Sequence, residues 1–250
     1  SPAMPAPRHQ DVAVGDMVDP ADFGAFNESD VSDKPRFIRR LPGIDQKHAR
    51  NFARDQHQTM MSVDELTGAV LDTLRARGEL DNTLVIYMSD NGHLWGEHRW
   101  IGKNVPYART TEVPLLMRWY GHIAEGTTSD RIALNVDVTA TMAEAAGVDM
   151  PWSEGRSLFG SDTRTGFVLE AIAQRPPYKN RPAYCGWRTA ERLYVRYGTG
   201  EEELYLYKKD PAERRNLAES PQYADMVKTL RSKALEACDP VPPGFSWDGG

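Results

Sequence analysis

Two oxygen-bearing residues, Asp90 and Asn91, directly follow an apolar run, and a lysine, Lys103, lies a short way further along the chain. Carboxylate and amide oxygens are hard donors that suit Ca²⁺ or Mg²⁺ rather than zinc. A lysine ammonium is a mobile point charge that can bind an anionic oxygen, such as one from a sulfate or phosphate group. This order of residues predicts part of a metal-assisted site for an anionic substrate.

The same residues also have purely structural interpretations. Asp-Asn-Gly, which ends at Gly92, is a turn sequence in its own right, and a single lysine commonly lies at a solvated surface. His93 and His98 flank the same loop with Glu97 between them, and a histidine there could donate a proton or orient a leaving group. Each histidine taken singly also fits a polar loop residue, and their spacing matches no zinc motif.

Buried strands and helices are expected to position these side chains. Residues 84–88 and 114–119 are continuous apolar runs, which is the pattern of parallel strands covered on both faces. Apolar residues recurring at helical spacing predict a helix over 45–77, and a shorter helix is predicted over 139–146. The alternation indicates an α/β sheet with flanking helices, in which ligands bind beyond the carboxyl ends of strands.

The character of the chain changes after about residue 160. Residues 1–160 are expected to form the larger α/β part, within which residues 1–42 are rich in Pro, Asp and Gly and read as an extended, loop-like segment. Residues 161–250 are expected to form a small α+β subdomain with an antiparallel sheet and a final helix over 221–237. Its strands are short and rich in aromatic residues, with tyrosines at strand spacing that predict cross-strand packing, over 167–172, 184–188, 193–197 and 203–207.

The composition narrows the class of protein. The chain has 250 residues and a net charge of −6 without long single-sign runs, which argues against a nucleic-acid partner. Its apolar runs are shorter than the roughly 18 residues that a membrane helix needs, and no basic-plus-apolar leader opens it, so we expect that any secretion signal was removed or never present. Cys185 and Cys238 show no CxxC spacing, so zinc is not indicated; they either form a disulfide in an oxidising compartment or remain two thiols.

The segments, taken in order, resemble the sulfatase family of the alkaline-phosphatase superfamily. The resemblance rests on Ser-Asp-Asn-Gly over 89–92, Gly-Glu-His over 96–98, Gly-Lys over 102–103, Pro-Tyr over 106–107 and the strand over 113–119. Residues 135–141 and 155–158 resemble later family markers, and residues 194–218 resemble the family's C-terminal subdomain. The resemblance covers almost the whole chain and implies part of an alkaline-phosphatase-like sheet with flanking helices.

The resemblance also implies roles for individual residues. Asp90 and Asn91 correspond to two ligands of a Ca²⁺ (or Mg²⁺) ion, and Lys103 corresponds to a contact to the sulfate oxygens, with His98 as a second substrate-binding candidate. In the family the metal polarises the sulfuryl group and the lysine neutralises charge on its oxygens. The nucleophile is a formylglycine hydrate made from Cys or Ser within a Cys/Ser-x-Pro-x-Arg motif.

That nucleophile motif is absent from this sequence, because neither cysteine nor any serine fits it. The family's upstream pair of metal-binding aspartates and the residues that assist the leaving group are also absent. No catalytic residue is therefore assigned. We expect the chain to correspond to the C-terminal portion of a sulfatase, to bind Ca²⁺ weakly or not at all by itself, and to be inactive alone.

Two other functions remain open. A phosphodiesterase or phosphonate hydrolase of the same superfamily would share the fold and the metal pair, and a non-catalytic protein could retain the scaffold as a binding module. The expected partners are a sulfate-ester small molecule or sugar, the missing N-terminal half, and a second copy bound through an exposed sheet face, with no nucleic acid and no membrane. The family favours a secreted or extracytoplasmic location, and the sequence does not name the substrate.

Overall fold

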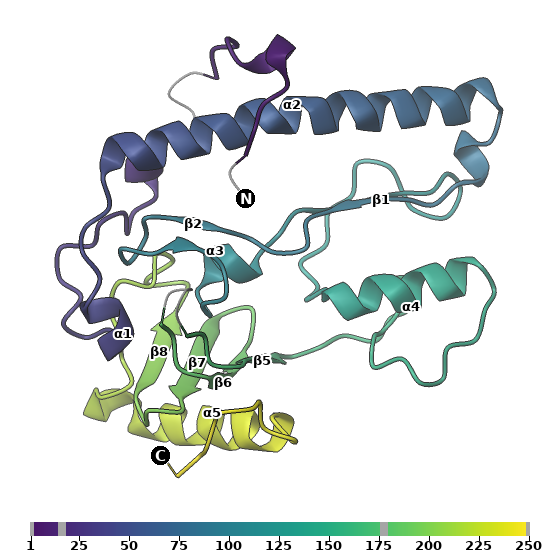
Figure 1. Cartoon of the computed structure of the whole chain (residues 1–250). Coiled ribbons are helices and arrows are strands. Elements are labelled where there is room, and N and C mark those ends of the chain that lie inside the picture. Colours follow the sequence, from purple (N-terminus) through teal and green to yellow (C-terminus); the bar gives the residue numbers. More distant parts are fainter. Residues whose placement is uncertain (1–2, 15–18, 176–179, 249–250) are drawn as a thin grey trace. The chain divides into compact units, whose positions relative to one another are not determined.

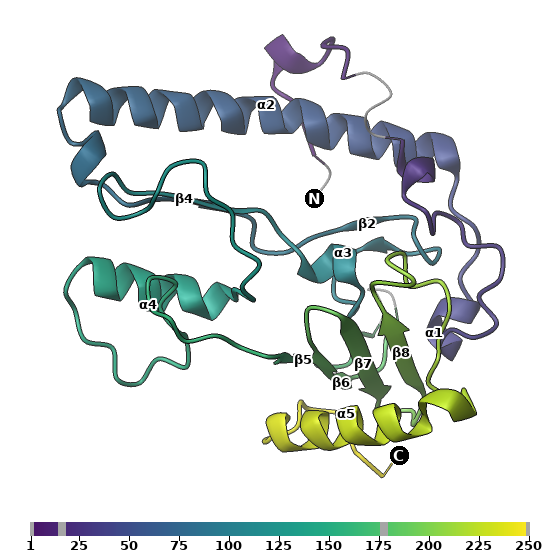
Figure 2. The same ribbon diagram turned by 180° about the vertical axis from the view of Figure 1, so that it is seen from behind.

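The computed structural model describes residues 3–14, 19–175 and 180–248, and the chain divides into two compact units (Figures 1 and 2). The first unit comprises residues 1–15, 54–91 and 113–164, and the second comprises residues 16–53, 92–112 and 165–250. The units interleave along the chain, whereas the division expected from sequence runs linearly through residue 160. The structure mixes helices and strands and contains the small C-terminal antiparallel sheet that the sequence predicts.

The long helix predicted over 45–77 is α2, Gln46–Ala76. Its start is capped by Asp45, whose carboxylate accepts a hydrogen bond from the backbone N–H of His48 at 2.7 Å. It ends at Ala76, and Gly78 follows with a φ of +71°, in the left-handed region that favours glycine. A short 3₁₀ turn, η4 (Leu80–Asn82), follows and leads into the first strand.

The first unit contains a pair of strands, β1 (Val85–Met88) and β4 (Leu115–Arg118). Figures 1 and 2 show α2 running along one side of this pair and α4 along the other. The prediction that these strands are parallel and covered on both faces is wrong in both respects, because β1 and β4 pair antiparallel and are only partly buried. An apolar run is typical of buried parallel strands, but the direction of a strand is set by its pairing with a distant segment, which the run itself does not specify.

The helix α4, Asn135–Ala145, begins before the predicted residue 139. Its first turn is capped by Asp137, which accepts hydrogen bonds from the backbone N–H groups of Leu134 and Arg156, both at 2.8 Å, and pairs with Arg164. Burial alone would raise the pKa of Asp137, but these hydrogen bonds hold it below its usual value. Asp137 therefore ties residues 153–164 to the start of α4.

The second unit is built on a four-stranded sheet that is antiparallel, as predicted, and has the strand order β5-β6-β7-β8. Tight turns connect β6 to β7 and β7 to β8, and α5 lies along one face of the sheet (Figure 1). The short turn η5 (Pro221–Tyr223) precedes α5. The elements of this subdomain are β5 (Phe167–Ala171), β6 (Tyr184–Arg188), β7 (Arg192–Tyr197), β8 (Glu202–Leu206) and α5 (Ala224–Ala237).

Both faces of this sheet are buried. Apolar side chains of α5 cover one face, where Cys185 and Cys238 form a disulfide across a Cα–Cα distance of 6.4 Å, so the disulfide alternative is the one observed. Side chains from residues 31–38 and 94–107 cover the opposite face. Alternation along β7 explains this, because Tyr194 points toward α5 while Leu193 and Val195 point to the other cluster.

Three short elements carry the segment over 92–112, namely β2 (Leu94–Trp95), β3 (Ile101–Gly102) and α3 (Ala108–Thr111), with β2 and β3 antiparallel. The N-terminal segment, predicted to be loop-like, contains the helical turns η1 (Pro7–His9), η3 (Pro20–Asp22) and α1 (Arg36–Arg39). Residues 1–2 and 15–18 of that prediction lie outside the described residues. No helix in the described part of the chain combines the length and hydropathy of a membrane span.

Candidate functional site

Asp90 and Asn91 lie immediately beyond the C-terminal end of β1, in the first unit. The Asp90 carboxylate accepts a hydrogen bond from the backbone N–H of Asn91 at 2.9 Å, and the hydroxyl of Ser89 donates to the Asn91 carbonyl at 2.9 Å. The carbonyl of Asp90 accepts from the side-chain amide of Asn135, at the start of α4, at 3.0 Å. The turn that carries both oxygen donors is thus fixed to β1 and α4.

These two residues fit part of the coordination shell of a hard cation. Asp90 is exposed, Asn91 is half-buried, and both offer side-chain oxygens of the kind that Ca²⁺ and Mg²⁺ prefer. Ca²⁺ takes roughly six to eight oxygen ligands, and the residues that the structure describes include no cluster of three or more His, Cys, Asp or Glu side chains able to hold a metal ion. Asp90 and Asn91 would therefore hold such an ion only together with further oxygen ligands.

Gly92 begins the part of the loop that belongs to the second unit. Its N–H donates to the carbonyl of Thr110 at 3.0 Å, and the next N–H, from His93, donates to the carbonyl of Arg109 at 2.9 Å. A Cβ on Gly92 would lie 1.9 Å from the Arg109 carbonyl oxygen, which is far inside van der Waals contact. Only glycine fits at this position without a backbone shift.

Lys103 directly follows β3 and is exposed in the second unit. The β2–β3 pairing places Leu94 opposite Gly102, and Gly102 and Asn104 on either side of Lys103 have φ values of +124° and +70°. Glu97, within the β2–β3 turn, accepts from the backbone N–H of Trp95 at 2.7 Å. The lysine is thus carried on a short hairpin whose turn is closed by a side-chain hydrogen bond.

The structure places His98 in the interior of the second unit, with 1% of its surface exposed. Its Nδ1 is hydrogen-bonded to Glu28 at 2.7 Å, and its ring packs against that of Tyr107 in a tilted arrangement with a centroid distance of 4.3 Å. His93 is half-buried between Phe52 and Trp95. This burial favours a supporting role for His98 over direct contact with a substrate.

Sequence reasoning missed the groups that surround His98. Glu28 and Lys34 are both buried, and the Lys34 ammonium lies 3.5 Å from Glu28 and 2.8 Å from Asp33. Both residues come from the segment predicted to be a loop, and their pattern in the sequence carries no sign of burial. A buried charge must be paired, but the pairing becomes visible only when the distant segments are brought together.

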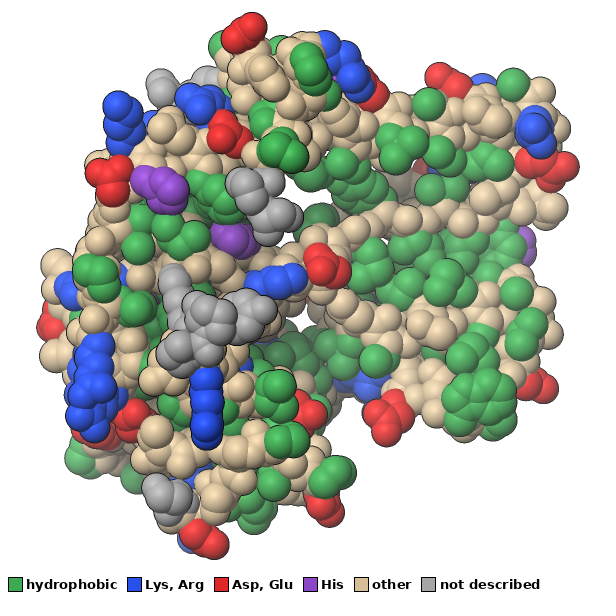
Figure 3. Space-filling view, in the orientation of Figure 1, with side chains coloured by type: hydrophobic (Ala, Val, Ile, Leu, Met, Phe, Trp, Pro, Cys, Tyr) green, Lys and Arg blue, Asp and Glu red, His purple; other side chains and the backbone are tan. Residues whose placement is uncertain are grey.

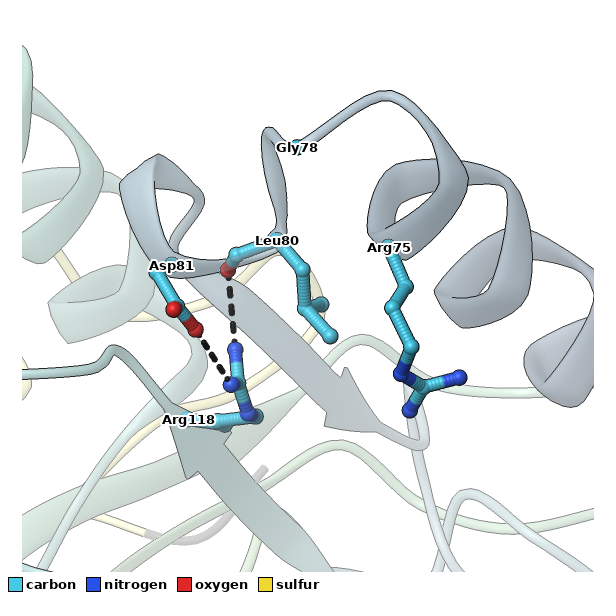
Figure 4. Close-up of a pocket in the computed structure, with 5 residues that line it drawn as sticks. All are labelled: Arg75, Gly78, Leu80, Asp81 and Arg118. Atoms are coloured by element: carbon cyan, nitrogen blue, oxygen red, sulfur yellow. Dashed lines mark hydrogen bonds and ion pairs between the residues drawn. The ribbon is translucent and has the colours of Figure 1, made fainter.

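A cavity of about 320 Å³ in the first unit lies away from the predicted donors (Figure 4). The guanidinium of Arg118 donates to the Leu80 carbonyl at 2.8 Å and to Asp81 at 3.0 Å. The cavity lies near the N-terminal end of β1, whereas Asp90 lies beyond the C-terminal end of the same strand. Its lining residues are Arg75, Gly78, Leu80, Asp81 and Arg118.

The family profile described as Sulfatase matches residues 20–148, which is more than half of the chain, and the chain therefore belongs to the sulfatase family. The chain is 32% identical over 198 residues to the N-acetylglucosamine-6-O-sulfatase of Bacteroides thetaiotaomicron, covering 72% of this chain and 34% of that protein. It is 31% identical to the arylsulfatase of Volvox carteri, covering 98% of this chain and 44% of that protein. These matches confirm the resemblance stated from the motifs.

Solved structures share the fold. A protein in complex with its substrate D-glucosamine-2-N,6-O-disulfate superposes with a TM-score of 0.72 at 30% identity, covering 78% of this chain and 42% of that chain. The phosphonate monoester hydrolase of Agrobacterium radiobacter shares the fold, with a TM-score of 0.66 at 22% identity, covering 78% of this chain and 43% of that chain. The chain spans about a third to a half of the length of these relatives.

Proposed function

We propose that this chain forms part of a sulfatase that hydrolyses sulfate esters, and that its substrates are sulfated sugars. The observation that carries the proposal is the pair of oxygen donors at the C-terminal end of β1, followed by Lys103 on its hairpin, in a chain of the sulfatase family. The substrate class is supported by one relative named N-acetylglucosamine-6-O-sulfatase and by a neighbour in complex with its substrate D-glucosamine-2-N,6-O-disulfate.

In this proposal each of the three predicted site residues, Asp90, Asn91 and Lys103, has a defined role. Asp90 and Asn91 supply oxygen ligands to a Ca²⁺ or Mg²⁺ ion, which when bound would act as a Lewis acid toward the sulfuryl group. Lys103 binds the sulfate oxygens and neutralises their charge. The formylglycine nucleophile and the remaining metal ligands are supplied by residues outside this sequence, in the polypeptide that corresponds to the rest of the relatives' length.

Hydrolysis of a phosphonate or phosphodiester is the alternative within the same superfamily. The phosphonate monoester hydrolase neighbour supports the shared fold only, since its identity is 22%. The relatives above 30% identity that carry a substrate in their names are sulfatases, which favours a sulfate ester. A Cys/Ser-x-Pro-x-Arg motif in the same polypeptide would support sulfate, and a lone Thr nucleophile would support phosphate.

The location that best fits these observations is outside the reducing cytoplasm. The disulfide between Cys185 and Cys238 is of the kind that persists in oxidising compartments. Some relatives are named as extracellular sulfatases. We therefore place the protein in a secreted or extracytoplasmic setting as part of the same proposal.

The test is an activity assay on two proteins. The purified 250-residue chain is expected to release no sulfate from an aryl sulfate, because it lacks a nucleophile, whereas a polypeptide that joins it to an upstream Cys/Ser-x-Pro-x-Arg segment is expected to turn over. In the active protein Lys103→Ala should lower kcat/KM about 10²-fold or more, while Lys228→Ala, on the exposed face of α5, should not. Turnover by the isolated chain, or full activity of Lys103→Ala, would contradict the proposal.

A further inference from the structure

A buried carboxylate on β8, Glu203, has no part in the chemistry proposed above. It has no exposed surface, and its two oxygens accept hydrogen bonds from three phenols, Tyr107 at 3.0 Å, Tyr205 at 2.6 Å and Tyr197 at 2.6 Å. Burial raises the pKa of Glu203, and the hydrogen bonds from the tyrosines oppose that rise. A carboxylate in the interior is costly unless it is fully hydrogen-bonded, so this group specifies the positions of its three donors.

One of the three donors comes from the segment that carries Lys103. Tyr197 and Tyr205 belong to the sheet itself, on β7 and β8, whereas Tyr107 follows the β2–β3 hairpin. The next residue, Ala108, donates its backbone N–H to the buried carboxyl group of Glu213 at 2.9 Å. Tyr107 and Ala108 are therefore held by carboxyl groups from β8 and from the turn that follows it.

The residues before the lysine are held in the same buried network. His98 is hydrogen-bonded to Glu28 and its ring packs against Tyr107, so the two ends of the segment 98–107 meet at these rings. Lys34 lies 3.5 Å from Glu28 and 5.5 Å from the ring centre of Tyr205, which joins both ends to the sheet. Lys103 itself is exposed, but the chain on both sides of it is fixed to buried, charged groups.

We propose that Glu203 is a positioning residue that acts through Tyr107 to hold residues 98–108, and with them Lys103, in a single conformation. An apolar side chain at this position would cost less to bury, and its packing would fix the direction of the three phenols less sharply. The antiparallel subdomain is then the base that sets where the lysine hairpin stands. The consequence for catalysis rests on the proposed function, whereas the consequence for the conformation of the segment does not.

The test compares Glu203→Gln and Tyr107→Phe with a matched control, Glu202→Gln. Glu202 is the preceding residue of β8 and faces the other side of the sheet, where it accepts hydrogen bonds from Tyr194, Arg196 and Arg231. In the 250-residue chain, amide hydrogen exchange is measured peptide by peptide, and the acetylation rate of the Lys103 amine is measured by mass spectrometry after treatment with acetic anhydride.

Loss of the Glu203–Tyr107 hydrogen bond is expected to speed exchange over residues 98–108 about tenfold, because opening of a segment is governed by its local stability. Exchange in α5 should change less than about twofold, and the acetylation rate of Lys103 should shift several-fold. Glu202→Gln should have the opposite pattern: amide exchange should become faster in α5, while exchange over residues 98–108 and the acetylation rate of Lys103 should stay unchanged.

Two results would overturn the proposal. Residues 98–108 could remain as protected as in the parent chain, or exchange could rise equally throughout the second unit, which would mark Glu203 as a general stabiliser. If Glu203→Gln does not fold, Tyr107→Phe, which removes one hydroxyl, decides the question alone. In the longer, active protein Tyr107→Phe should raise KM more than it lowers kcat; an inactive parent would refute the proposed function but leave the exchange result valid.

Discussion

Glu213 is a buried carboxyl group whose ionisation opposes folding. Burial raises its pKa to about 8, while the hydrogen bond from the Ala108 backbone and the charge of Arg188 act in the opposite direction. The unfolded chain releases this proton near the ordinary pKa of 4.5, but the folded chain keeps it until about pH 8. Stability must therefore fall as the pH rises through that window. The titratable and charged groups that face it are Arg188, Glu203, Glu112 and Tyr207.

Glu213→Gln should remove this pH dependence. The variant is expected to gain stability relative to the parent chain as the pH rises from 5 to 9, by a few kcal/mol in total, since each unit of pKa shift corresponds to about 1.4 kcal/mol. Thermal melts of both proteins at a series of pH values measure the effect. Glu219→Gln, at an exposed position, is the control. Parallel stability curves for Glu213→Gln and the parent would contradict the assignment.

At this scale the sequence identifies the residues that carry family motifs and misses those that support them. Asp90, Asn91 and Lys103 lie in short contiguous motifs, so their positions can be read directly. Glu28 lies outside these motifs, and Glu203 lies in a stretch that resembles the family without a role being assigned to it. The supporting roles of both become visible only from burial and from partners that are distant in the chain, as in the hydrogen bonds to His98 and Tyr107.

The turn after β1 depends on the absence of a side chain at Gly92. The Arg109 carbonyl oxygen occupies the space that a Cβ would need. In contrast, Gly68 lies at an exposed position inside α2, where an added Cβ meets no atom within 4 Å. The two glycines therefore offer the same substitution in opposite environments.

Gly92→Ala is expected to destabilise the chain by about 1–3 kcal/mol, because the added carbon forces a backbone shift. Gly68→Ala is expected to stabilise it by about 0.5–1 kcal/mol, since alanine loses less backbone entropy in a helix. Urea titrations followed by circular dichroism measure both. A neutral Gly92→Ala would show that the turn can relax, and a destabilising Gly68→Ala would argue against the helix at that point.

The elements differ in how well the sequence predicts them. The period of α2 and the turn-separated aromatic strands after residue 160 are local patterns, and both predictions are confirmed. The direction of β1 relative to β4 depends on pairing between distant segments, and that prediction is wrong. The early start of α4 depends on Asp137, which accepts the capping hydrogen bond from Leu134 and is itself held by the more distant residues 156 and 164.

Several large apolar side chains of the molecule are exposed to solvent. Figure 3 shows hydrophobic side chains gathered over the region of β1 and α4 in the first unit. Trp152 is 74% exposed and Leu116, on β4, is 60% exposed. Exposed apolar patches of this kind favour association. The other exposed apolar residues of the first unit's β4–α4 region are Tyr120, Val136, Met142 and Val148.

The 250-residue chain is therefore expected to self-associate in a concentration-dependent way. Sedimentation velocity over a wide concentration range should show a rising weight-average coefficient, and the double variant Leu116→Ser, Trp152→Ser should reduce the rise. Leu235→Ser, which removes an exposed leucine from α5 in the second unit, is the matched control. A parent chain that sediments as a single monomer at every concentration would contradict this expectation.

The disulfide between β6 and the end of α5 closes a covalent ring that spans 53 positions and contains β7, β8 and α5. Lys208, Lys209, Arg214 and Arg215 lie within that ring and are exposed, so trypsin can cut there. Such a nick would divide the backbone without separating the two pieces. The nicked protein should migrate as one band on a gel without reductant and as two bands after reduction.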